Sequence, residues 1–360
     1  MLEKFSKLFR VKPKKFLGID IGASSVRMVE LSRKGKGFKL ENYGEMSLAQ
    51  PDGKPFKEFK GNTIRLSSKE VAENISAIIK EARIETKDAC FSIPDFGTFF
   101  TNIEIPVMDE EEIAQAVKYQ SRTYIPLSLD DVTLDWSVVE GTPSKTSLKI
   151  LVVAIPNDII AHYKKVTVLT SLNLRFLEPE VFALARSLVK EDKKVSGLID
   201  IGATSTTCSI LEDKKVKISH SFNVAGNELT NVIARSLNIG YNEAEDLKKK
   251  QGLLPKDETG NPEDIRKLLI PLVGSILDET KKAFRDFYTR EGKEVQEVLL
   301  SGGLALMPGL KEFFSVELKK PIILSDPFFG IEAPAMLSNT LKEIGPYYGV
   351  AIGLALKGLE

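Results

Sequence analysis

The sequence predicts an α/β protein with two related lobes that face each other across a cleft, and three observations support this. First, one phrase occurs twice, as GIDIGASS at residues 18–25 and as LIDIGATS at residues 198–205. Each copy follows an apolar run and precedes a β-rich run, which predicts two strands joined by a tight turn. Second, 360 residues exceed the size of one ordinary core. Third, residues 94–156 have a strand–helix–strand–strand pattern that predicts a small inserted subdomain or, alternatively, a continuation of the first lobe.

The composition limits the classes of protein to consider. With 42% hydrophobic and 28% charged residues, the chain is typical of a soluble globular protein. Its 50 basic and 50 acidic residues cancel, so no overall field attracts nucleic acid. No apolar run reaches 18 residues and no signal-peptide core is visible, so we expect a cytoplasmic protein. Cys90 and Cys208 lie in apolar β-like runs and should be buried thiols, while His162 and His220 lack a metal-type spacing.

The first 15 residues form a basic, amphipathic segment. Leu2, Phe5 and Phe9 would share one face of a helix, and six Lys or Arg residues supply positive charge. Such a segment can rest on an anionic membrane surface, or it can be a frayed terminus or dock on its own domain. The sequence leaves these readings open.

The elements of the first lobe follow in order. Residues 16–49 are β-rich and contain the first hairpin, and residues 51–62 predict a surface loop or hairpin tip. Residues 68–83 predict a helix, because Ser67 or Ser68 can cap it and apolar residues recur every three or four positions. In the insert, Asp109 and Glu112 predict a capping box for a helix that carries Ile113, Val117 and Tyr124 on one side. The strands expected in these two regions are 89–93, 99–105, 132–139 and 148–155.

Beyond the insert, helical and strand patterns continue to alternate. The expected helices are 157–169, 179–189, 226–237, 242–251, 264–288, one from about Pro308, and 346–356. The expected strands, besides the second hairpin, are 175–178, 216–222, 295–300 and 321–324. A charged linker at 190–194 precedes the second hairpin, and a loop at 252–263 separates the helices at 242–251 and 264–288.

The two turns have the chemistry of a phosphate site. Glycine lets the backbone approach closely, and successive N–H groups in a tight turn form a concave anion site. Asp20 and Asp200, if brought together, would hold Mg²⁺ largely through water, because Mg²⁺ keeps most of its hydration shell. Arg27 can extend the first turn toward a β- or γ-phosphate, or it can face solvent. The expected phosphate-binding residues are Gly22, Ala23, Ser24, Ser25, Arg27, Gly202, Ala203 and Thr204.

A third glycine-rich turn follows the strand at 295–300. Its residues Gly302, Gly303, Leu304 and Met307 would let a flat nucleoside lie against the backbone. Behind two phosphate-type hairpins, this turn resembles the adenosine segment of the actin-like ATPase superfamily. Glu245 and Lys248 match that superfamily's helix beside the nucleoside, although a solvated helix face would look the same.

Within that superfamily the chain is similar to the PilM family of type IV pilus assembly, over nearly its whole length. The segments that carry the likeness are 16–31, 93–95, 99–108, 124–126, 153–156 and 178–188. The resemblance implies an actin-like ATPase fold with two RNase H-like lobes and an inserted subdomain 1C of the kind found in FtsA. It implies subdomain 1A at 1–93 and 157–190, 1C at 94–156, 2A at 191–226 and 292–360, and 2B at 227–291.

The resemblance also implies ligands and partners. ATP and Mg²⁺ would bind in the interlobe cleft, and the cytoplasmic N-terminal tail of PilN would bind between the first lobe and the insert. PilN, PilO and PilP would connect the chain to the pilus machine, with the motor ATPases nearby. The chain would then lie at the cytoplasmic face of the inner membrane and meet it peripherally. A type II secretion-like machine and self-association both stay open.

Hydrolysis needs a polar group that orients water in line with the γ-phosphate. Glu178 matches the superfamily's position for this group, but a carboxylate before a helix can also simply cap its N-terminus. We therefore expect ready ATP binding, slow turnover at most, and a nucleotide that acts as a conformational switch. The alternatives are an FtsA-like polymerising protein, a small-molecule kinase of the same fold, and a scaffold that binds no nucleotide.

Overall fold

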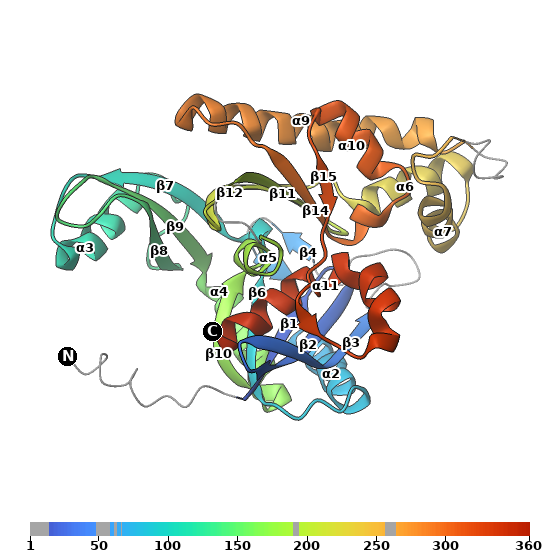
Figure 1. Ribbon diagram of the computed structural model, residues 1–360, viewed down its shortest axis with the longest axis horizontal. Helices are drawn as coiled ribbons and strands as arrows, with labels where there is room; N and C mark the ends of the chain where they lie inside the picture. The colour runs from blue at the N-terminus through green and yellow to red at the C-terminus, as the bar shows by residue number, and fades with distance from the viewer. Residues whose placement is uncertain (1–13, 48–57, 61–62, 66, 190–193, 256–263) are drawn as a thin grey trace.

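The structure is a computed structural model, and it describes residues 14–47, 58–60, 63–65, 67–189, 194–255 and 264–360. Outside these residues lie 1–13 of the basic N-terminal segment, most of the loop expected at 51–62, all but Lys194 of the linker expected at 190–194, and 256–263 of the loop expected at 252–263. The described part forms two lobes, with a smaller subdomain beside them (Figure 1). None of its helices is both long enough and apolar enough to cross a bilayer.

The first lobe is built on a six-stranded sheet in the order β10-β6-β1-β2-β3-β16. β1 and β2 form the first predicted hairpin, and β3 continues it antiparallel, whereas β6 and β10 run parallel to β1. Because side chains alternate along a strand, the sheet has two apolar faces. The bounds of the strands are β1 Lys15–Ile21, β2 Ser25–Lys34, β3 Gly37–Ser47, β6 Asp88–Ile93 and β10 Asn173–Pro179.

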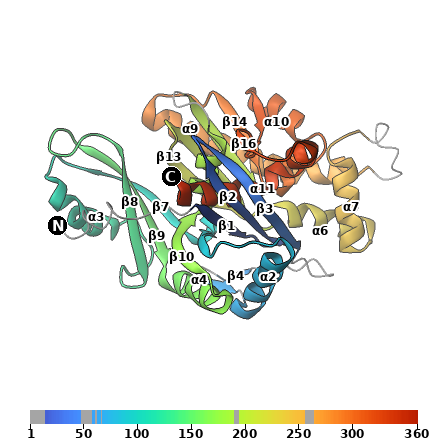
Figure 2. The ribbon, with the colours of Figure 1, turned by 60° about the horizontal axis from the view of Figure 1, so that its bottom comes forward.

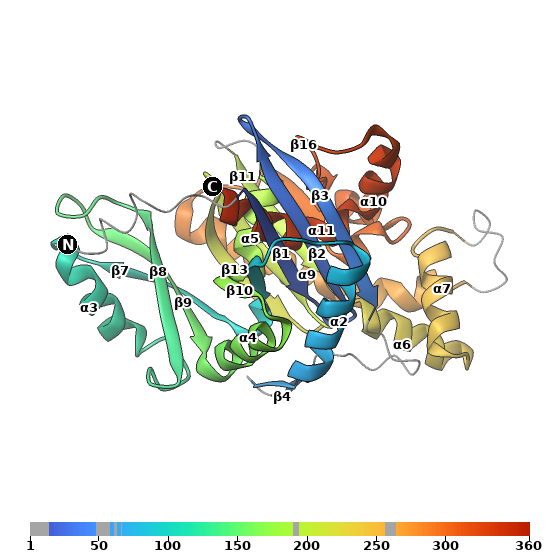
Figure 3. The same cartoon turned by 90° about the horizontal axis from the view of Figure 1, so that it is seen from below.

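Helices cover both faces of this sheet. Figure 3 shows α2 (Ser68–Glu81) and α4 (Asn157–Thr170) beside each other on one face of the sheet. Their buried residues pack against Leu17 and Ile19 of β1. The Ser67 hydroxyl accepts a hydrogen bond from the Glu70 N–H at 3.3 Å, so Ser67 is the cap of α2. α5 (Glu180–Leu188) and α11 (Ser338–Leu359) pack on the other face. A short hairpin, β4 (Glu58–Lys60) and β5 (Thr63–Arg65), begins inside the region expected at 51–62 to be a loop or hairpin tip and ends three residues after it.

The C-terminal segment corrects the predicted division, which assigned 292–360 to the second lobe. β16 (Ile331–Glu332) pairs with β3, and α11 lies on β1 and α5. A Cβ at Gly18 would lie 1.9 Å from the Ala351 carbonyl oxygen, so only glycine lets the helix approach the sheet this closely. α11 also begins eight residues before the predicted start at 346 and keeps Pro346 inside it.

The inserted block forms a separate three-stranded antiparallel sheet in the order β7-β9-β8, with α3 packed on it (Figure 2). The strands are β7 Phe99–Ile105, β8 Val132–Glu140 and β9 Leu148–Pro156, and α3 is Glu110–Ser121. The predicted capping box is wrong, because the Asp109 carboxylate accepts a hydrogen bond from the Ser144 hydroxyl at 3.0 Å instead. Tyr124 is also not on the buried side of the helix; it follows α3 and is 58% exposed.

The second lobe has a five-stranded sheet in the order β13-β12-β11-β14-β15. β11 and β12 form the second predicted hairpin, and α9 and α10 cover the sheet at the top of Figure 1. α6 and α7 extend beyond the sheet at the end opposite the inserted block. The strands are β11 Val195–Ile201, β12 Thr206–Glu212, β13 Lys215–Phe222, β14 Glu297–Ser301 and β15 Ile322–Leu324; the helices are α6 Gly226–Leu237, α7 Tyr241–Gln251, α9 Arg266–Glu291 and α10 Leu310–Leu318. Cys208 is buried in this core and Cys90 in the first.

The inserted subdomain also contacts the second lobe through polar groups. The Asn102 side-chain amide on β7 donates to the Lys217 carbonyl on β13 at 2.6 Å. The Lys149 ammonium on β9 lies 3.1 Å from the Glu291 carboxylate at the end of α9 and 3.2 Å from Glu140 on β8. The insert therefore touches both lobes.

Candidate nucleotide site

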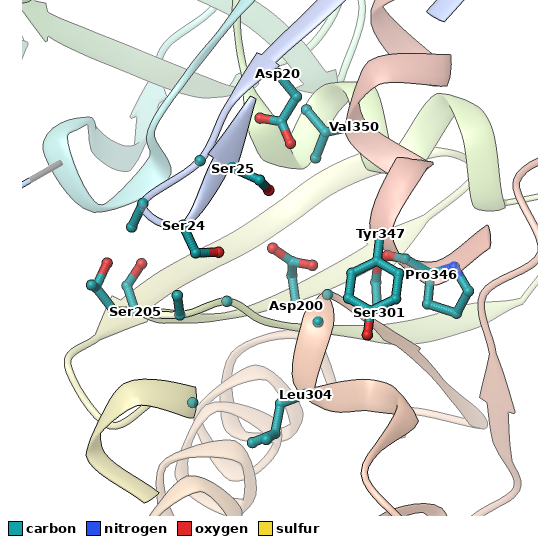
Figure 4. Close-up of a pocket in the computed structure, with 18 of the residues that line it drawn as sticks. Asp20, Ser24, Ser25, Asp200, Ser205, Ser301, Leu304, Pro346, Tyr347 and Val350 are labelled. Atoms are coloured by element: carbon teal, nitrogen blue, oxygen red, sulfur yellow. The ribbon is translucent and has the colours of Figure 1, made fainter. Parts of the chain in front are cut away.

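A cavity of about 680 Å³ lies between the two lobes. Asp20 and Ser24 from the first hairpin and Asp200 and Ser205 from the second all face it, as Figure 4 shows. The parallel strands β1, β6 and β10 end at this edge of the first sheet, which is where open α/β sheets place their ligands. The repeated phrase therefore converges on one cavity.

The sequence repeat is also a structural repeat. The Gly22 N–H donates to the Ser25 carbonyl at 2.9 Å, and the Gly202 N–H donates to the Ser205 carbonyl at 3.0 Å. A Cβ at either glycine would lie 3.1 Å from that same carbonyl, which crowds the turn. The two turns thus offer the cavity matching backbone from opposite sides.

The two aspartates are close enough to repel each other. The Asp20 carboxylate is buried and accepts a hydrogen bond from the Ser92 hydroxyl at 2.8 Å. Burial, and then the charge of Asp20, raise the pKa of Asp200 to about 6, while Ser301 and Arg27 act in the opposite direction. A divalent cation would relieve this repulsion. Since the described residues contain no cluster of three or more metal-ligating side chains, such a cation would take its other ligands from water and phosphate.

Two donors beside the aspartates fit an anionic ligand. The Ser25 hydroxyl and the Arg27 Nε are both buried, and neither has a hydrogen-bond partner among the residues that the structure describes. A buried polar atom without a partner costs free energy, and these two lie at the cavity, where a bound phosphate would accept hydrogen bonds from them. Ser25 is drawn beside the cavity in Figure 4. The residues present therefore fit a phosphate chain with its metal ion.

The third glycine-rich turn forms the wall on the second lobe. Gly302 has a φ of 86°, and a Cβ there would lie 2.4 Å from the Ile201 carbonyl oxygen. Its N–H donates at 3.2 Å to the carbonyl of Pro346 in α11, which joins this turn to the first lobe. Gly303, Leu304 and Met307 line the cavity, as expected for a nucleoside wall.

Glu245 and Lys248 also line the cavity, but they are bound to each other. The Lys248 ammonium lies 2.7 Å from the Glu245 carboxylate and donates to the Thr230 hydroxyl at 2.7 Å and the Gly226 carbonyl at 3.0 Å. Burial lowers the pKa of Lys248, and the Glu245 charge opposes this. The network fixes α7 against the start of α6, so its first role is to shape the wall.

The structure contradicts the catalytic role predicted for Glu178. Its carboxylate lies 2.7 and 2.8 Å from the Arg186 guanidinium and 2.6 Å from the Lys357 ammonium, and it does not line the cavity. Burial would raise the pKa of Glu178, but these two cations hold it below its ordinary value. The reason is the register of β10, which turns Glu178 toward α11. Glu180, the first residue of α5, lines the cavity instead.

Several lining residues were missed by the sequence reasoning. Tyr347, Pro346 and Val350 reach the cavity from α11, which carries no local signal for a binding site. Glu45 and Ser47 lie at the end of β3. They were not predicted, because they are about 20 residues away from the first turn in the sequence. The others missed are Pro94, Glu180, Leu184, Thr207, Gly226, Asn227, Lys249, Ser301 and Leu306.

Comparisons with known proteins bear on the family and the fold of the chain. Residues 18–359 match the family model described as type IV pilus assembly protein PilM. The chain resembles a solved PilM–PilN type IV pilus biogenesis complex with a TM-score of 0.84, at 23% identity over 97% of this chain and 99% of that one. It resembles the ethanolamine utilization protein EutJ of Carboxydothermus hydrogenoformans with a TM-score of 0.59, at 17% identity over 96% and 90% of the two chains. These likenesses show an actin-like ATPase fold.

Sequence relatives point to the same superfamily. The cell division protein FtsA of Enterococcus faecalis is 28% identical over 191 residues, which is 46% of this chain and 42% of that protein. FtsA of Pseudomonas aeruginosa is 24% identical over 203 residues, or 50% and 46% of the two chains. The cell shape-determining protein Mbl of Bacillus subtilis is 24% identical over 177 residues, or 41% and 53%. The chain spans less than half the length of the two FtsA relatives.

Proposed function

The chain belongs to the PilM family of type IV pilus assembly proteins, and on that premise we propose that it is the ATP-binding, actin-like component of a pilus assembly platform. The observation that carries the nucleotide proposal is the pair of matched hairpins, whose aspartates face one interlobe cavity. The partner we propose is the N-terminal tail of PilN. It is supported by the family match and by the likeness to a PilM–PilN complex.

The residues have distinct roles in this proposal. The backbone N–H groups and hydroxyls of residues 23–25 and 203–205 would hold the phosphates. Asp20 and Asp200 would bind Mg²⁺ through water, and the turn at 302–307 would hold the nucleoside. Bound Mg²⁺ would neutralise phosphate charge and lock the geometry of the chain of phosphates. Because both lobes contact the same ligand, its binding favours the closed arrangement of the lobes.

Turnover would be slow at most, so the nucleotide serves as a switch. The Glu178 carboxylate is paired with Arg186 and Lys357, so we assign it no role in orienting water, although the superfamily pattern suggested that role. The nucleotide would then change the affinity for PilN, and through it for PilO, PilP and the motor ATPases. This places the chain at the cytoplasmic face of the inner membrane, held there by its partners.

Calorimetric titration with ATP and Mg²⁺ tests the nucleotide proposal. Asp20→Ala should abolish binding, because it removes half of the metal site, and unchanged affinity would remove Asp20 from the site. Asp278→Ala, at an exposed position of α9, is the matched control and should bind as the original chain does. A pull-down from membranes, with and without ATP, tests the partner: recovery of a protein other than PilN would contradict that part.

A polymerising role is the second candidate, because FtsA and Mbl are among the sequence relatives. ATP-dependent light scattering and filaments in the electron microscope would favour it. A protein that stays monomeric in solution when ATP is added would favour the platform role.

A further inference from the structure

Three side chains from three different elements meet at the edge of the cavity. Arg27 on β2 is paired in register with Glu45 on β3, and the Arg27 Nη2 lies 2.8 Å from the Glu45 carboxylate. The Arg27 Cζ lies 5.1 Å from the centre of the Tyr347 ring on α11. All three residues line the cavity. The guanidinium therefore lies between a carboxylate and an aromatic face, beside the first phosphate-type turn.

The Arg27 guanidinium contacts Glu45 and Tyr347, but not all of its N–H groups donate hydrogen bonds to described residues. Its side chain is only 14% exposed, yet its Nε has no hydrogen-bond partner within the described part of the chain. Its partner Glu45 is 39% exposed, and an ion pair with a solvated carboxylate contributes little free energy. A phosphate can accept two parallel N–H bonds from a guanidinium, which is a stronger arrangement. An exchange of Glu45 for a phosphate is therefore favourable for Arg27.

Tyr347 is fixed by the second lobe, although its helix packs on the first. The carbonyl of Pro346 accepts hydrogen bonds from the Gly302 N–H at 3.2 Å and the Ser301 hydroxyl at 3.4 Å. The ring lies against Gly303, where a Cβ would be 3.2 Å from its Cε1 atom. The turn at 301–303 thus anchors Pro346, which directly precedes Tyr347. The Tyr347 ring is therefore held in one position over the guanidinium.

We propose that Tyr347 is a positioning residue that holds Arg27 for the phosphate chain, and that Glu45 is a substitute anion which the phosphates displace. The inference rests on the proposed binding of ATP. It concerns the phosphates alone, so it predicts that changes at Tyr347 and Glu45 alter the affinity for ATP and leave the affinity for adenosine unchanged.

Calorimetry with ATP·Mg²⁺ and with adenosine tests this. Tyr347→Leu should weaken ATP binding about 3- to 30-fold, the range of a cation–π contact, and should leave adenosine binding unchanged. Tyr347→Phe keeps the ring and should bind ATP within about twofold of the original chain. Glu45→Gln should tighten ATP binding about threefold, because Arg27 no longer has to leave a carboxylate.

The Arg27→Ala background supplies the control for each change. If Tyr347 and Glu45 act through the guanidinium, neither substitution should alter ATP affinity further once Arg27 is gone. Equal weakening of ATP and adenosine by Tyr347→Leu would overturn the inference and make the ring a nucleoside wall. A weaker ATP complex in Glu45→Gln would overturn the substitute-anion role. If the original chain binds no ATP, the proposed function fails together with the inference. If it binds ATP but the effects of Tyr347 and Glu45 do not depend on Arg27, only the inference fails.

Discussion

Replacing Asp200 with asparagine should stabilise the ligand-free protein at neutral pH. Burial and the charge of Asp20 raise the pKa of Asp200 to about 6 from an ordinary value of 3.8. Because the folded-state pKa is the higher one, the stability linked to this group is fully present below about pH 4 and is lost as the pH rises through about 6. At pH 7.5 the shift of about two pKa units corresponds to a penalty of about 3 kcal/mol. Asparagine keeps the shape of the side chain but carries no charge.

Denaturant unfolding without nucleotide or metal measures this penalty. Asp200→Asn should be more stable by about 3 kcal/mol at pH 7.5, and the gain should fall to about half by pH 5, where the folded-state aspartate is largely protonated. The same change at the exposed Asp278 should alter the free energy of unfolding by less than about 0.5 kcal/mol. An Asp200→Asn protein that is less stable at pH 7.5, or a gain that does not change with pH, would refute the reasoning. The variant should also lose Mg²⁺-dependent ATP affinity, which separates stability from binding.

Three further predictions test the surroundings of the site. Glu178→Gln should cost about 3–5 kcal/mol in denaturant unfolding, because it leaves two cations without their buried carboxylate, while ATP affinity stays the same; a loss of affinity would restore Glu178 to the site. Gly353→Ala should destabilise by about 1–3 kcal/mol or more, because its Cβ would lie 1.9 Å from a carbonyl oxygen of α5, whereas Gly274→Ala, with open space around it, should cost nothing. Lys149→Met should speed amide exchange across the insert with little change in overall stability, because it removes the ion pair to Glu291; unchanged exchange would show that the pair does not hold the insert.

The sequence predicted what is encoded locally. Both hairpins are formed by neighbouring residues, so the repeated phrase was enough to place Asp20 and Asp200 in matching turns. The helix at 68–81 followed from its own cap and periodicity. These features depend on few contacts with the rest of the chain.

Features that depend on distant contacts were not predictable. The capping box at Asp109 fails because Ser144, far along the chain, binds the carboxylate. Glu178 and Glu180 lie on either side of a strand–helix junction, and the strand register and the partners from α5 and α11, all set by distant contacts, decide which one lines the cavity. The return of residues 331–359 to the first lobe depends on close approaches at Gly18 and Gly353, and a glycine in a sequence does not say what it will touch.

That return has a consequence for synthesis on the ribosome. One face of the first sheet is covered by α11, which is translated only after the whole second lobe has been made. All strands of the second lobe's sheet lie within residues 195–324, so this lobe can fold as soon as they emerge from the ribosome. The first lobe keeps apolar side chains uncovered until α11 has emerged, so the nascent chain should need a chaperone up to that point.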